Sequence, residues 1–147
     1  MTALAVVLTL VAGLAGAVQV AVMGRFGERI GTLPALAVAA IVAAAIALAA
    51  LLVARRSLAG FGDAARQPPW MWLGGVAGAL IVFTITLAAP RIGTFATIGV
   101  FIAAQLAMGV VIDRFGLFGL DRIPLAWTRI AGLALLAVGA GLTLHRS

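Results

Sequence analysis

Five long apolar blocks, separated by short segments that carry the charges, constrain this chain more than any other feature. They cover residues 3–24, 33–54, 70–89, 94–112 and 125–144. Each approaches the roughly 20 residues that an α-helix needs to cross the hydrocarbon core of a bilayer. Hydrophobic residues make up 65% of the 147 positions, an excess that a soluble domain of this size does not bury. We therefore predict an all-α integral membrane protein with five transmembrane helices in a single domain over residues 1–147.

The block boundaries carry further expectations. The first block lacks a positive segment before it and exceeds the 7–15 apolar residues of a secretory signal, so we expect a retained helix. The third block should stop at Pro90, because proline has no N–H to continue a helix. Arg129 lies one turn inside the fifth block, and we expect its side chain to reach for the interface.

Arginine placement predicts the orientation. Six of the ten arginines fall on the side of the membrane that holds the N-terminus, and four fall on the other side. Positive residues favour the cytoplasm, so a margin of two arginines places the N-terminus inside. Two explanations stay open: either few charges suffice to fix one orientation, or the chain inserts both ways and pairs with an inverted copy. Five helices plus five inverted helices give the inverted-repeat architecture common among transporters.

Several function classes find no support. The chain has no cysteine and one histidine, His145, and its four acidic residues lie at block ends or in loops. We expect no enzyme activity, metal site or cofactor, because neither a catalytic set nor a phosphate loop can be assembled. The net charge of +6 comes from arginines scattered between apolar blocks, a pattern typical of membrane surfaces and not of nucleic-acid binding.

Two glutamines are the only amides inside the blocks, and both are candidate site residues. A buried amide is costly unless it is hydrogen-bonded, so Gln19 and Gln105 should face protein or a wet cavity. Gln19 shares its helix face with Met23, and Gln105 shares its face with Phe101 and Met108. Two interpretations remain: the amides lock helices together, or they bind the polar part of a substrate beside an adaptable apolar wall.

Other small and polar residues rank as candidates for packing or binding. Thr84 is a lower-ranked cavity residue, because threonines in helices more often bond to their own preceding turn. Gly74 and Gly78 form the close-approach spacing of spanning helices, and Gly132 with Gly139 form a stripe suited to dimer packing. Gly99 heads a ladder of small residues in the fourth block, on the face roughly opposite Gln105.

Two runs of sequence resemble a known family. "GLAGAVQVAVMGRFGERIG", followed by "PPWMWLGGVAGALIVFTITLAAPRIGTFATIGVFIAAQLAMGVVIDRFGLFG", is similar to the YdcZ-type small inner-membrane proteins of bacteria. The most specific positions are Gln19, Trp72, Gly74, Gly75, Pro90, Gly93, Gln105, Asp113 and Gly116. The resemblance covers nearly the whole chain and places it in the drug/metabolite transporter superfamily.

The resemblance implies a multi-pass protein of the bacterial inner membrane, acting as a pair with a second copy or a related five-helix partner in inverted orientation. It implies a transporter, an exporter by class, that moves a small metabolite or drug-like molecule of unassigned identity. Many members carry Asn where Met23 stands, and a Ser/Gly motif where this chain reads "AAIVAAAIA". Two other interpretations remain: a non-transporting subunit that stabilises another membrane complex, and a passive pore, against which the lack of a polar lining argues.

Overall fold

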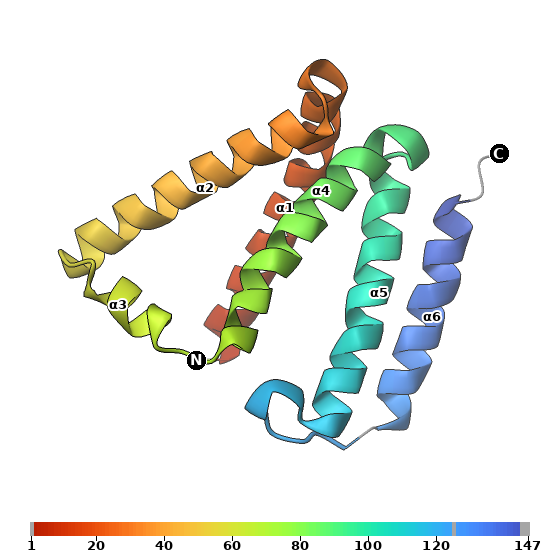
Figure 1. The fold of residues 1–147 in the computed structure, drawn as a ribbon. Helices are drawn as coiled ribbons and strands as arrows, with labels where there is room; N and C mark the ends of the chain where they lie inside the picture. Colours follow the sequence, from red (N-terminus) through yellow and green to blue (C-terminus); the bar gives the residue numbers. More distant parts are fainter. Residues whose placement is uncertain (1, 125, 145–147) are drawn as a thin grey trace. The chain divides into compact units, whose positions relative to one another are not determined.

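The computed structural model describes residues 2–124 and 126–144, and over them the chain forms helices joined by short turns and loops. Five helical segments are long and apolar enough to cross a membrane (Figure 1). They are α1 (Thr2–Ile30), α2 (Thr32–Arg55), η1 with α4 (Pro69–Trp72 and Leu73–Ile92), α5 (Thr94–Phe115) and α6 (Trp127–Leu144). No strand occurs within the described ranges. The predicted all-α fold with five spanning helices is therefore confirmed.

Helix α1 is longer than the first apolar block. It continues six residues past Gly24 and includes all three charges that follow. Its 29 residues span about 44 Å at 1.5 Å per residue, against a hydrocarbon core of about 30 Å. The last turns therefore extend beyond the hydrocarbon, where Arg25 and Glu28 form an ion pair of 2.9 Å. The helix ends at Gly31, whose φ of 91° is accessible mainly to glycine.

Pro90 does not end the third block, so that prediction was wrong. Helix α4 passes through Pro90 and continues to Ile92. The proline removes one N–H donor and so one hydrogen bond, and only two helical residues follow it. The break comes at Gly93, whose φ is 88°, and α5 begins directly after it. Glycine, and not proline, sets this boundary.

The other boundaries also differ in detail. The polar linker after α2 contains the short helix α3 (Ala59–Ala65). Helix α5 continues to Phe115 and ends at Gly116, which adopts a left-handed φ of 62°. A second 3₁₀ turn, η2, covers Leu117–Gly119. The last helix begins at Trp127, and residue 125, the first of the predicted block, lies outside the described residues.

The chain divides into two compact units, Met1–Val20 with Arg91–Ser147, and Ala21–Pro90. In the second unit two glycines of α1 make the closest helix contact. A Cβ at Gly24 would lie 2.9 Å from the Cβ of Ala89, and one at Gly27 would lie 2.5 Å from Cγ2 of Thr86. Thr86 is 1% exposed, and its hydroxyl donates to the carbonyl of Val82 at 2.6 Å. Small residues thus allow α1 and α4 to approach closely here.

Candidate binding site between α5 and α6

Helices α5 and α6 pack side by side as an antiparallel hairpin (Figure 1). Near one end, a Cβ at Gly99 would lie 3.1 Å from Oγ1 of Thr143 and 3.8 Å from Cα of Ala140. Ala140 is buried, and the Thr143 hydroxyl donates to its carbonyl at 2.7 Å. The small-residue face expected on α5 therefore does pack against a helix at Gly99.

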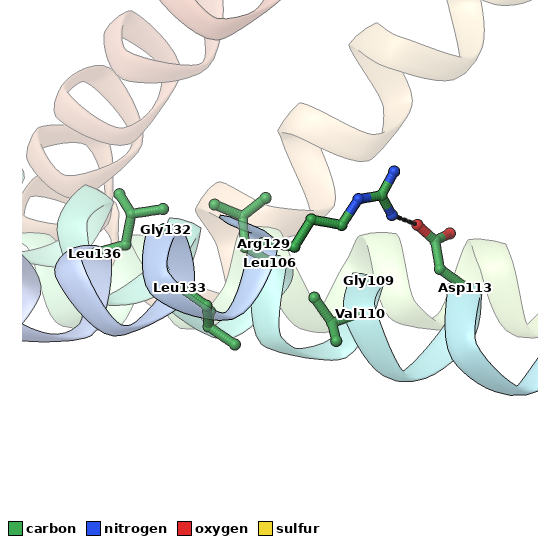
Figure 2. Close-up of a pocket in the computed structure, with 8 residues that line it drawn as sticks. All are labelled: Leu106, Gly109, Val110, Asp113, Arg129, Gly132, Leu133 and Leu136. Atoms are coloured by element: carbon green, nitrogen blue, oxygen red, sulfur yellow. Dashed lines mark hydrogen bonds and ion pairs between the residues drawn. The ribbon is translucent and has the colours of Figure 1, made fainter. Parts of the chain in front are cut away.

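Toward the other end the two helices leave an open groove of about 360 Å³. Figure 2 shows its lining, which is apolar except at one end. The lining residues are Leu106, Gly109, Val110, Asp113, Arg129, Gly132, Leu133 and Leu136. A Cβ added at Gly109 or at Gly132 would meet no atom within 4 Å. The groove therefore owes part of its width to missing side chains on both helices.

An ion pair closes the polar end of the groove. Nη1 of Arg129 lies 2.8 Å from Oδ2 of Asp113, and the two side chains are 44% and 36% exposed. Asp113 also accepts, at its backbone carbonyl, a 2.9 Å hydrogen bond from the N–H of Ile123. The ion pair and this backbone bond tie α6 and the α5–α6 loop to the C-terminal end of α5. An occupant of the groove would thus meet apolar walls and one charged pair.

A second groove, of about 410 Å³, continues along the same hairpin. Leu136 lines both grooves, and the rest of the second lining is apolar apart from Thr143. Gly139 contributes to this lining, and a Cβ added there would meet nothing within 4 Å. The stripe of Gly132 and Gly139 therefore borders open space along the hairpin.

Neither predicted amide faces these grooves. Gln105 lies on α5 with Phe101 and Met108, on a face about 120° around the helix from the groove-lining residues of α5. Gln105 and Met108 are exposed, and Phe101 is half-buried. Gln19, in the same unit, is also exposed on α1. Within the described part of the chain, the side-chain amide of neither glutamine forms a hydrogen bond.

The remaining predicted site residues lie elsewhere. Met23 is 5% exposed and Thr84 is exposed, and both belong to the unit Ala21–Pro90. Thr86, not Thr84, is the threonine that bonds to its preceding turn. A Cβ added at Gly74 or at Gly78 would meet no atom within 4 Å. The described contacts therefore do not assemble the predicted residues into one site.

Two features escaped sequence reasoning. The first is the partner of Asp113, which is Arg129, sixteen positions along the chain. The sequence did contain a signal for this pair. One span ends with an acidic residue and the next begins with a basic residue, and two such residues lie close together when the spans form a hairpin. The tight glycines Gly24 and Gly27 were overlooked because charged residues surround them.

The chain is similar to a known family and to one named relative. A family model described as "Putative inner membrane exporter, YdcZ" matches residues 4–142. The Inner membrane protein YdcZ of Escherichia coli (strain K12) is 34% identical over 94 residues, which cover 63% of this chain and 62% of that protein. The chain thus matches less than two thirds of the length of this relative. No solved structure matches the chain.

Five apolar spans define a small multi-pass membrane protein. The matched family model reaches into all five spans, and the chain belongs to the YdcZ family of the inner membrane. The family description names an exporter.

Proposed function

We propose that this chain is one half of an exporter formed by two five-helix units in inverted orientation. Its cargo is a small molecule with a hydrogen-bonding part and an apolar body, and the chain takes no catalytic step and needs no cofactor. The family description supports the export function. The second unit is either another copy or a related five-helix protein.

The observation that carries the proposal is the exposure of two amides within spans. Gln19 and Gln105 lie inside α1 and α5, and neither has a hydrogen-bond partner in the described chain. An amide left unsatisfied in an apolar medium costs about 2–7 kcal/mol. Two such amides are therefore expected to face a wet cavity, a substrate or a partner chain, and not lipid.

An inverted partner accounts for the amide depths. Gln19 lies beyond the middle of the first block and Gln105 beyond the middle of the fourth, and these two helices run in opposite directions. In an inverted copy, each amide lies at the mirrored depth on the other side of the membrane midplane. Four amides then line a cavity from both ends, and Phe101 and Met108 on the Gln105 face supply part of its apolar wall.

The α5–α6 hairpin supports the pairing. Its grooves expose Gly132 and Gly139, with open space where side chains would stand. In membranes such small-residue surfaces admit the backbone of another helix closely. We assign the main dimer contact to this stripe of α6.

The same stripe also favours the second candidate, a non-transporting subunit that assembles with another membrane complex. Transport by the purified chain separates the two. We would reconstitute it in liposomes, load a pooled panel of lipophilic cations, carboxylic acids and neutral amphiphiles, and follow release by mass spectrometry. If the chain is an exporter, at least one compound should leave faster than it leaves liposomes without protein. If every compound in the panel leaves at the rate of liposomes without protein, the non-transporting subunit is favoured.

A further inference from the structure

A hollow separate from the two apolar grooves lies where α5 ends and its loop folds back. Its volume is about 320 Å³, and its lining consists of Arg114, Phe115, Arg122, Ile123 and Pro124. Two arginines therefore line a small space together with three apolar residues. Because α5 is a membrane span that ends at Phe115, this space lies where hydrocarbon gives way to head groups.

Arg122 is held in place by the backbone beneath it. A Cβ at Gly116 would lie 2.8 Å from Cγ and 3.6 Å from Nε of Arg122, so the arginine stem rests on the bare glycine. The next residue, Ile123, donates its N–H to the carbonyl of Asp113. The loop thus fixes Arg122 beside Arg114 before any ligand arrives, which lowers the entropic cost of binding.

The charges around the hollow favour an anion. Asp113, the nearest acidic residue on α5, is already paired with Arg129. Within the described residues neither Arg114 nor Arg122 forms an ion pair, and the exposed carboxylate of Asp121 pairs with neither. Two guanidinium groups are therefore available for an incoming negative group.

We propose that this hollow binds the phosphate of an anionic phospholipid. Guanidinium groups match the geometry of phosphate oxygens through paired hydrogen bonds. Phe115, Ile123 and Pro124 offer an apolar surface to the glycerol and the first methylenes of the acyl chains. Basic pockets at the cytoplasmic ends of spanning helices recognise lipid head groups in this way, and in a copy with its N-terminus inside, the loop lies on the cytoplasmic side.

The test measures lipid binding to the full purified chain in detergent by native mass spectrometry. The probes are dioctanoyl phosphatidylglycerol, dioctanoyl phosphatidylcholine and glycerol 3-phosphate. We expect phosphatidylglycerol to bind most tightly. The double variant Arg114→Gln with Arg122→Gln should weaken it about twenty-five-fold, at about five-fold for each arginine near the membrane surface. Replacing both by Lys keeps the charge but loses the paired hydrogen bonds, so its affinity should fall between those of the parent and the Gln variant.

The matched control is Arg56→Gln with Arg66→Gln, which removes the same charge from the loop between α2 and α4. This control should leave phosphatidylglycerol binding unchanged. An equal loss in the control overturns the site, since surface charge alone then accounts for binding. Equal binding of phosphatidylcholine also overturns it. Glycerol 3-phosphate binding as tightly as phosphatidylglycerol overturns the lipid assignment and indicates a site for a free phosphorylated solute.

Discussion

Replacing Gly27 with Ala should destabilise the fold, although alanine is the better helix former. The added Cβ would lie 2.5 Å from Cγ2 and 3.3 Å from the carbonyl oxygen of Thr86. Overpacking of a tight contact costs about 1–3 kcal/mol, while alanine in place of glycine within a helix returns about 1 kcal/mol. The expected net loss is thus up to about 2 kcal/mol.

Gly16→Ala is the matched control on the same helix, because a Cβ added at this position would meet no atom within 4 Å. It should gain up to about 1 kcal/mol, so the two variants should differ by about 1–3 kcal/mol. The assay is unfolding of the purified protein by SDS titrated into mild detergent, followed by circular dichroism.

A second change identifies the clashing atom. Thr86→Ser removes Cγ2 but keeps the hydroxyl that donates to the carbonyl of Val82. In the double variant most of the Gly27→Ala penalty should disappear, which a double-mutant cycle measures directly. If Gly27→Ala is as stable as Gly16→Ala, or if Thr86→Ser rescues nothing, then α1 and α4 do not meet as the structure shows.

Three further predictions concern the α5–α6 hairpin and the orientation of the chain. Asp113→Asn should lower the free energy of unfolding by no more than about 1 kcal/mol, because the pair with Arg129 is substantially exposed; a larger loss in the same SDS titration contradicts this. Gly139→Leu should keep the monomer folded, since the site has room, yet weaken the dimer; an unchanged dimer by crosslinking and size measurement refutes the assigned interface. Two arginines added near Arg91 should shift the orientation reported by C-terminal fusions, whereas a population fixed N-inside argues against dual insertion.

The five spans could be predicted because the hydropathy of a span is summed over about 20 residues, so one atypical residue changes the sum little. Helix ends depend on one residue, which explains the error at Pro90: the decisive residue was Gly93, free to adopt a φ of 88°. Charge misled the interpretation of α1 as well, because Arg25 and Glu28 continue a helix beyond the hydrocarbon as readily as they end one.

The candidate site was harder to predict, because a site depends on which helices become neighbours. Helical spacing correctly separated the Gly99 face of α5 from the Gln105 face. Spacing within one helix does not reveal that Asp113 meets Arg129 across a hairpin. Nor does it reveal the grooves, which arise where glycines of two helices leave space together.

The central claim, that the span amides bind cargo, is tested most directly by liposome transport with Gln19→Leu and Gln105→Leu. Gln67→Leu is the control, because this glutamine lies in the linker between spans. We predict that both span variants keep the helical signal and the unfolding transition of the parent. Liposomes that contain either variant should release no compound faster than liposomes without protein, while Gln67→Leu transports normally. Unimpaired transport by either span variant contradicts a cargo-binding role for that amide, and unfolding of the variant shows that the amide instead joins helices.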